Sequence, residues 1–211
     1  MSVSCFTGVP GSGKSMDAAR VLYRWLNGRS DCRVVANFLV DLSLVKHPER
    51  FIYVSNDDMN TKRLADIAEE YFSTHDFRES SLLLIVDECQ VLYNSRRWAK
   101  DKDRQTWLTF TSQHRKLGYD VIFIAQSMMM IDAQMRMNVE YEVQHRKVSN
   151  VGIIGFLMGS LFLGRLFVKI TTYVGMKERL GSEFFIGRKR YMDLYDSYAT
   201  FDRSAATQSV N

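Results

Sequence analysis

Proline and cysteine are scarce in this sequence, and each scarcity excludes a class of protein. Only two prolines occur in 211 residues, so disordered segments and rigid proline-rich linkers are not expected. The three cysteines, Cys5, Cys32 and Cys89, are odd in number and far apart. This excludes a disulfide framework and indicates buried thiols in a reducing compartment. The four histidines have no metal-ligand spacing, so we expect no metal held by protein side chains alone.

A signal peptide is also missing. The first residues run into a short apolar stretch and a glycine-rich loop, without a basic segment followed by a long apolar run. We therefore expect the N-terminal part to lie in the cytosol. The chain is 46% apolar and 25% charged, as in folded globular proteins, and its length suits one α/β domain with a modest extension.

The excess of positive charge is confined to the last third of the chain. Residues 1–140 carry 18 basic and 18 acidic side chains, whereas residues 141–211 carry 10 and 6. The densest point is the run Arg188-Lys189-Arg190. A solvated basic face, contact with an anionic membrane surface and contact with nucleic acid each fit this distribution, and the choice stays open.

Buried strands and amphipathic helices alternate along the first 148 residues. The patterns predict strands near residues 2–6, 33–38, 51–55, 82–86, 120–125 and 140–148. They predict helices over residues 14–26, 61–72, 103–117 and 132–138. Such alternation implies an α/β fold with a mostly parallel central sheet, flanked by helices and joined by right-handed crossovers.

The run 148–164 is unusual because its 17 residues contain no charge and are interrupted by glycines. A bilayer span needs about 20 apolar residues, and Arg165 and Lys169 end this run early. A buried strand pair, a subunit contact, a segment dipping into a membrane surface and a true span all stay open. We expect a first domain over 1–148, followed by a C-terminal extension over 149–211 with this apolar segment and a basic, tyrosine-rich tail.

The most specific motif is the run Gly8-Val9-Pro10-Gly11-Ser12-Gly13-Lys14-Ser15, which matches the phosphate-binding loop pattern in full. Its glycines allow backbone angles that turn N–H groups onto phosphate oxygens, and the following helix directs its positive end at the same place. Lys14 can reach the β- and γ-phosphates, Ser15 can ligate Mg²⁺, and Met16 continues the cradle. The motif predicts a P-loop ATPase. ATP is favoured because the guanine-specifying Asn-Lys-x-Asp run is absent.

Polar residues follow two of the expected buried strands. Asp87 and Glu88 come directly after the strand at 82–86, at the sheet edge where α/β proteins bind ligands. Asp87 can hold the Mg²⁺ shell, mostly through water, and Glu88 can polarise an attacking water. In ATPases that insert a strand between the two nucleotide-contacting strands, a polar residue at its end senses the γ-phosphate, and Gln126 is the candidate. A plain polar strand end is the alternative.

Arginines are the candidates for stabilising transferred phosphate charge from a neighbouring subunit. Arg115 and Arg136 are the two that we single out, and surface ion pairing is the alternative for both. Trp98 and Trp107 are expected to pack in the protein interior. No aromatic residue is uniquely placed to stack on a purine, so the sequence does not reveal the base pocket.

Four strings in a fixed order carry a family resemblance: Thr7–Ser15, Leu84–Cys89, Tyr93–Trp98 and His114–Gln126, with a faint echo at Leu194–Tyr198. Together they resemble the zonular occludens toxin-like (Zot) family, which includes the gene I assembly proteins of filamentous bacteriophages. The resemblance is good over residues 3–150 and thins beyond them. It implies an ATP- and Mg²⁺-dependent P-loop fold of the additional-strand class, similar to HerA, FtsK and RecA.

The resemblance also implies a function. It points to an oligomeric motor, such as a hexameric ring, that powers assembly and export of filamentous phage particles. The expected partners are a membrane-associated phage assembly protein and the phage coat or single-stranded-DNA-binding protein. The expected location is the host cytoplasm, at the cytoplasmic face of the inner membrane. A DNA-translocating or packaging motor and a non-hydrolysing, nucleotide-gated scaffold are the alternatives, and nucleic acid contact stays open.

Overall fold

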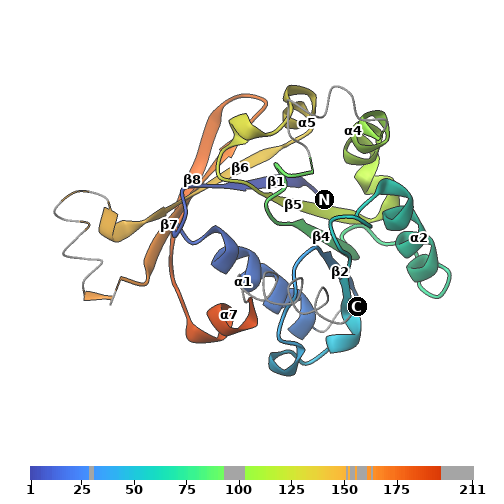
Figure 1. The fold of residues 1–211 in the computed structure, drawn as a ribbon, viewed down its shortest axis with the longest axis horizontal. Coiled ribbons are helices and arrows are strands. Elements are labelled where there is room, and N and C mark those ends of the chain that lie inside the picture. Colours follow the sequence, from blue (N-terminus) through green and yellow to red (C-terminus); the bar gives the residue numbers. More distant parts are fainter. Residues whose placement is uncertain are drawn as a thin grey trace, which may run out of the picture.

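One mixed sheet of eight strands forms the centre of the protein, and helices cover both of its faces (Figure 1). The structure is a computed structural model, and it describes residues 1–28, 31–92, 103–150, 152, 155, 161–162 and 164–195. The strands are β1 (Val3–Thr7), β2 (Arg33–Ala36), β3 (Phe51–Tyr53), β4 (Leu82–Val86), β5 (Tyr119–Ile124), β6 (Tyr141–Lys147), β7 (Leu166–Tyr173) and β8 (Glu178–Ile186).

A helix separates consecutive strands as far as β6, except that only two 3₁₀ turns lie between β2 and β3. The helices are α1 (Lys14–Asn27), α2 (Thr61–Phe72), α4 (Arg104–Gln113), α5 (Ala133–Met137) and α7 (Lys189–Leu194). Short 3₁₀ turns are found at Leu42–Leu44, Pro48–Arg50, His114–Leu117, Met128–Met130 and Val148–Asn150. The helix α2 begins at Asn60, whose side chain accepts a hydrogen bond from the backbone N–H of Arg63 and so caps its first turn.

The strand order is β3-β2-β4-β5-β1-β6-β7-β8. All pairs from β3 to β6 are parallel, whereas β7 pairs antiparallel with both β6 and β8. The strand β5 therefore lies between β1, which leads into the glycine-rich loop, and β4, which is directly followed by Asp87. This confirms the predicted mostly parallel sheet with an inserted strand.

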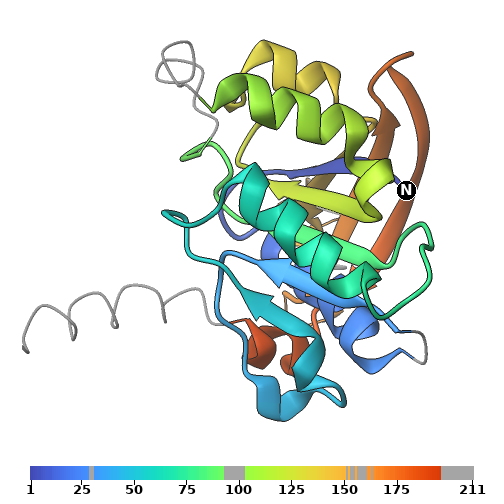
Figure 2. The same ribbon diagram turned by 90° about the vertical axis from the view of Figure 1, so that its right-hand side faces the viewer.

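Two hydrophobic cores lie on opposite faces of the sheet, because neighbouring residues of a strand point in opposite directions. On β4, Leu82, Leu84 and Val86 pack with α2, α4 and α5, whereas Leu83 and Ile85 pack with α1 and α7. Figure 2 shows these two groups of helices on either side of the sheet. The strand β4 is therefore buried on both faces, as its continuous run of aliphatic residues predicted.

The predicted helix over 103–117 is divided in the structure. The helix α4 ends at Gln113, and residues 114–117 continue as a tighter 3₁₀ turn. Gly118 then closes the turn with φ 74°, a left-handed conformation that glycine adopts easily. The 3₁₀ turn delivers the chain directly into β5.

The strands β7 and β8 and the helix α7 were not predicted from the sequence. The expected domain boundary at 148/149 falls between β6 and β7, which are adjacent strands of the same sheet. Most of the run 148–164, the string Tyr93–Trp98 and residues 196–211 lie outside the described residues. Among the residues that the structure describes, no helix is long and apolar enough to cross a membrane.

Candidate functional site

The glycine-rich loop joins β1 to α1, as predicted. Gly8 and Gly13 have φ of 144° and 97°, which side chains other than glycine rarely adopt. A Cβ on Gly8 would lie 2.5 Å from the carbonyl oxygen of His145, and one on Gly13 would lie 2.7 Å from the ring of Phe167. Neither position has room for a larger residue, so the loop is held tightly against β6 and β7.

Lys14 is buried and folds back over its own loop. Its Nζ donates hydrogen bonds to the carbonyl oxygens of Gly8, at 2.8 Å, and Val9, at 3.3 Å. Burial lowers the pKa of Lys14, and the nearby carboxylates of Glu88 and Asp87 act in the opposite direction. The ammonium group therefore lies at the centre of the loop and faces the two acidic residues expected to act with it.

The hydroxyl of Ser12 provides a test of whether the loop fits a phosphate. Ser12 is 1% exposed, and its Oγ has no hydrogen-bond partner within the described part of the chain. A buried hydroxyl without a partner is unfavourable by about 1–3 kcal/mol. Phosphate oxygens would supply acceptors for this hydroxyl and for the amino group of Lys14, so the residues present fit a nucleotide phosphate.

Asp87 follows β4 and is held through its backbone by Asn37, at the end of β2. The side-chain amide of Asn37 donates to the carbonyl oxygen of Asp87, at 2.9 Å, and its Oδ1 accepts from the Asp87 N–H, at 2.7 Å. Both polar groups of Asn37 are thereby used, and its Nδ2 also contacts Asn56 at 2.7 Å. Sequence patterns did not single out Asn37, although it is a polar strand-end residue like Gln126.

Glu88 has an unusual backbone conformation. Its φ is 47°, in the left-handed region where a residue with a side chain is strained by roughly 1–2 kcal/mol. Its N–H donates to Asp87 Oδ1 at 2.8 Å, and its carboxylate accepts a hydrogen bond from the Gln90 side chain. The side chain is exposed. The two consecutive carboxylates at this turn therefore have different hydrogen-bond donors: the Glu88 N–H for Asp87, and the Gln90 side chain for Glu88.

Gln126 lies beside the P-loop. Its carbonyl oxygen accepts a hydrogen bond from the Gly8 N–H at 3.2 Å. Its exposed side chain borders a pocket of about 440 Å³ that also touches Gly8 and Val9. The inserted strand therefore delivers Gln126 to the first residue of the loop, while its role as a γ-phosphate sensor stays a prediction.

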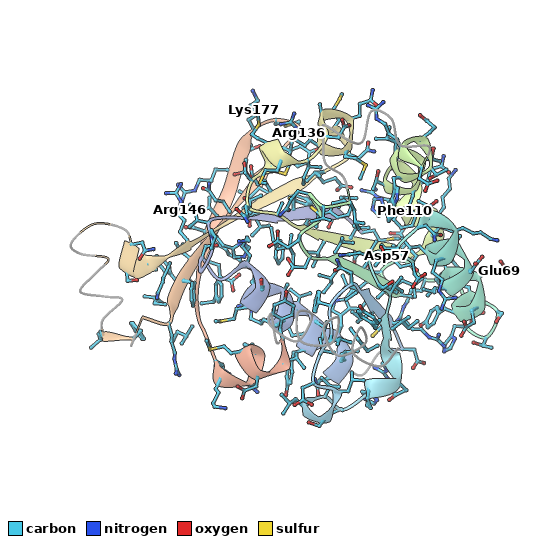
Figure 3. All side chains as sticks on the ribbon, viewed as in Figure 1. Asp57, Glu69, Phe110, Arg136, Arg146 and Lys177 are labelled. Carbon is cyan, nitrogen blue, oxygen red and sulfur yellow. The ribbon has the colours of Figure 1, made fainter. Side chains whose placement is uncertain are left out.

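The two candidate arginines lie away from this P-loop. Arg115 pairs with Glu140 at 2.9 Å, before β5 and β6 begin and so at the sheet edge opposite the loop. Arg136 lies on α5, on the opposite side of the sheet from α1, where its guanidinium contacts Met129 (Figure 3). Both arginines thus contact residues outside the P-loop of their own chain, and a role in a neighbouring subunit's site stays a prediction.

A pocket of about 890 Å³ lies over the P-loop. Its lining includes Gly11–Met16, Lys147, Arg165, Phe167, Tyr191 and Tyr195. The β6–β7 pairing explains the two cations, because Lys147 lies opposite Phe167 in the register and Arg165 directly precedes β7. The basic excess beyond residue 141 was the only sequence signal for them.

A buried ionic cluster joins α1 to β6 and β7 below the loop. The Asp17 carboxylate, fully buried, contacts Arg20 at 2.8 Å, His145 at 3.0 Å and Lys169 at 3.5 Å. Burial would raise the pKa of Asp17, but the hydrogen bond to His145 and the charges of Lys169 and Arg20 bring it below its usual value. These contacts fix the first turn of α1 against β6 and β7, the two strands that supply Lys147 and Phe167 to the pocket over the P-loop.

The inserted strand, the P-loop and the carboxylate strand together define a P-loop NTPase fold of the additional-strand class. The chain belongs to the zonular occludens toxin (Zot) family, whose profile matches residues 2–200. The Gene 1 protein of Escherichia phage If1 is 30% identical to it over 95% of this chain and 58% of its own length. The Gene 1 protein of Salmonella phage IKe is 34% identical over 79% and 46%. This chain therefore spans about half the length of these curated relatives.

Solved structures share the fold. The N-terminal domain of zonular occludens toxin from Neisseria meningitidis has a TM-score of 0.57 at 17% identity, covering 93% of this chain and 100% of that one. The genome packaging NTPase B204 of Sulfolobus turreted icosahedral virus 2, in complex with ATP-gammaS, has a TM-score of 0.53 at 11% identity, covering 89% and 98%. At such identities the similarity supports the fold alone.

Proposed function

We propose that this chain hydrolyses ATP. The observation that carries the proposal is the meeting of Lys14 with Asp87 and Glu88 at one sheet edge, across the inserted strand β5. The loop N–H groups and Lys14 bind the β- and γ-phosphates. Glu88 accepts a proton from, or orients, the attacking water, and Gln126 contacts the γ-phosphate. Ser15 and Asp87 would hold Mg²⁺, which neutralises charge on the phosphates.

The rest of the nucleotide has a place in the 890 Å³ pocket. Met16, Phe167 and Tyr191 supply apolar and aromatic surface beyond the end of the P-loop, and Lys147 and Arg165 supply positive charge. We expect the ribose and base to lie between β7 and α7, with the two cations near the phosphates. This assigns the base a pocket that the sequence patterns did not reveal.

The relatives support a role in phage assembly. Because the chain spans about half of each Gene 1 protein, we propose that it is the ATPase part of a filamentous phage assembly and export machine. It would act as a homo-oligomer at the cytoplasmic face of the host inner membrane. Its partners would be a membrane-associated assembly protein and the phage coat or single-stranded-DNA-binding protein.

A DNA-translocating motor is the second candidate, favoured by the basic run at 188–190 and by the fold shared with a packaging NTPase. Internal contacts weaken this candidate. Lys189 pairs with Asp193 at 2.7 Å, and the Arg190 guanidinium lies 5.5 Å from the centre of the Tyr23 ring. The Arg190 contact helps to hold α7 on α1, and Lys189 is paired within α7, which leaves less charge for DNA.

Two variants test hydrolysis. Lys14→Ala should abolish ATP binding, whereas Glu88→Gln should keep binding and lose phosphate release by about 100-fold or more. Normal turnover by Glu88→Gln would refute the assignment of Glu88. ATP binding by the wild type without any turnover would favour the scaffold instead. Stimulation of turnover by DNA, weakening steeply with salt, would favour the translocation motor.

A further inference from the structure

The hydroxyl of Tyr195 lies at the corner of the site that is expected to hold Mg²⁺. It donates a hydrogen bond to Asp87 Oδ2, and Tyr195 lines the same pocket as Ser15. Tyr195 comes directly after α7, more than a hundred residues from Asp87 in the sequence. Its phenol group therefore links the P-loop, the carboxylate strand and the C-terminal segment at one point.

The backbone around Tyr195 is firmly attached on the α1 side of the sheet. Leu194 is fully buried, and its carbonyl oxygen accepts a hydrogen bond from the Asp41 N–H at 3.1 Å. Tyr195 forms a β-bridge with Val40, and its ring packs edge-on against Phe38 with 4.6 Å between centroids. These contacts present the phenol to the site in a defined orientation.

A phenol in this position and a magnesium ion exclude each other. Ser15 and Asp87 would hold the ion and its waters with their side-chain oxygens. The phenol donates to Asp87 Oδ2, so it occupies the oxygen through which Asp87 would hold the ion or its waters. A phenol is also not among the oxygen ligands that Mg²⁺ usually takes in proteins.

We propose that Tyr195 is a latch on the metal-binding corner of the site, which Mg²⁺-nucleotide must displace. The inference rests on the proposed nucleotide function and goes beyond it. The latched form keeps α7 and Tyr195 over the P-loop, and Mg²⁺-nucleotide favours the released form because only that form can bind the ion. The segment 187–195 thereby senses whether the site holds a metal–nucleotide complex.

Coupling of this kind acts in both directions. Any contact that draws α7 and Tyr195 away from the P-loop also removes the phenol from Asp87, and so strengthens Mg²⁺-nucleotide binding. Metal-free nucleotide needs no space between Ser15 and Asp87, so its binding should be insensitive to the latch.

The test compares nucleotide binding by the 211-residue chain with Mg²⁺ and with EDTA, using a fluorescent ATP analogue. Tyr195→Phe removes the hydroxyl and keeps the ring against Phe38. We expect it to tighten Mg²⁺-dependent binding about fivefold, the effect of losing one hydrogen bond from the latched form, and to leave metal-free binding unchanged. Tyr173→Phe is the matched control: it removes a phenol hydroxyl at the end of β7, opposite Tyr141 and at the sheet edge away from the P-loop, and should change neither value.

A second measurement follows the segment itself. The three native cysteines are buried, whereas the Lys189 side chain on α7 is 80% exposed and does not line the pocket, so Lys189→Cys can be labelled selectively with a fluorophore. We expect its emission to change with Mg²⁺-nucleotide, to stay constant with nucleotide and EDTA, and to respond less when Tyr195→Phe is also present.

Two results would overturn the latch. If nucleotide binds normally but Tyr195→Phe leaves the Mg²⁺ dependence unchanged, and the label at 189 does not respond, the latch is wrong and the proposed ATP site stands. If the wild type and Tyr195→Phe both fail to bind nucleotide in either buffer while their thermal unfolding is cooperative, the proposed function is wrong and the latch falls with it.

Discussion

The side chain of Asn37 binds both polar groups of the Asp87 backbone, accepting from its N–H at 2.7 Å and donating to its carbonyl oxygen at 2.9 Å. Asn37 thus fixes the peptide that carries the proposed magnesium ligand without needing to touch the ligand. We regard it as a positioning residue, because it acts on the reaction only through Asp87.

Asn37→Ala should impair the site more than the fold. Removing the amide leaves the buried backbone groups of Asp87 without their partner, which destabilises the protein by about 1–3 kcal/mol. We expect the Mg²⁺ concentration needed for half-maximal turnover to rise, because Asp87 is no longer held in place. Asn56→Ala is the control, since it removes only the contact between the two asparagines. An unchanged Mg²⁺ requirement in Asn37→Ala would refute the positioning role.

Two substitutions at Glu88 can separate the effect of this residue on stability from its effect on activity. Its φ of 47° is strained for alanine and acceptable for glycine. Both Glu88→Ala and Glu88→Gly should lose turnover, but Glu88→Gly should be more stable than Glu88→Ala by about 1 kcal/mol. Urea unfolding of the two variants measures the difference. Equal stabilities would mean that the turn relaxes and that the strain is not part of the folded site.

The buried cluster around Asp17 predicts a specific loss of stability in acid. The pKa of Asp17 is lowered in the folded protein from an ordinary value of 3.8. Its contribution is therefore fully present above about pH 4 and is lost as the pH falls through the lower folded pKa. Asp17→Asn should cost about 3 kcal/mol at pH 7, because Arg20 and Lys169 lose a buried partner, and should abolish much of the acid-dependent loss.

Urea unfolding at pH 7 and pH 3 tests this prediction. Glu183→Gln is the matched control, because Glu183 contacts the same two cations at 3.0 and 3.2 Å but its side chain is 53% exposed. We expect it to cost less than about 1 kcal/mol. If Asp17→Asn and Glu183→Gln are equally mild, the buried cluster contributes no more than a surface pair.

Arg115 can be tested by mixing subunits. Lys14→Ala subunits cannot hydrolyse ATP but still present Arg115, whereas Arg115→Ala subunits keep an intact P-loop. If Arg115 serves a neighbouring subunit, mixing the two inactive variants should restore part of the turnover. Glu140→Gln, which breaks the ion pair and keeps the arginine, should stay active. Full activity of Arg115→Ala alone would exclude the role, and the same mixture with Arg136→Ala would then test the second candidate.

The sequence predicted the sheet as far as β6 because these strands and helices carry local signals. The strand β4 is five aliphatic residues, α2 has a complete apolar stripe, and the P-loop has its glycines. The strand β8 has no such signal, because it is an edge strand that exposes apolar and charged side chains alike. A pattern search finds no buried face in such a strand.

Some residues of the site were not predicted from the sequence, and the reason differs from the one that applies to β8. Asn37, Lys147 and Tyr195 reach the nucleotide site through tertiary contacts between segments far apart in the chain. No spacing rule connects Tyr195 to Asp87, and a single sequence contains no information on which strand ends will meet. The faint family string at 194–198 was the only indication that the end of α7 matters.

The central position of β1 determines when the protein can fold during synthesis. Although β1 precedes them in the chain, both of its neighbours come much later: β5 pairs with it at residues 121–124 and β6 at 141–144. Such long-range pairings are slow to form, because a long loop must close before they stabilise anything. On the ribosome the P-loop strand must wait until residues 119–147 have emerged. The phosphate site is thus completed late in folding, although its loop is made before β5 and β6.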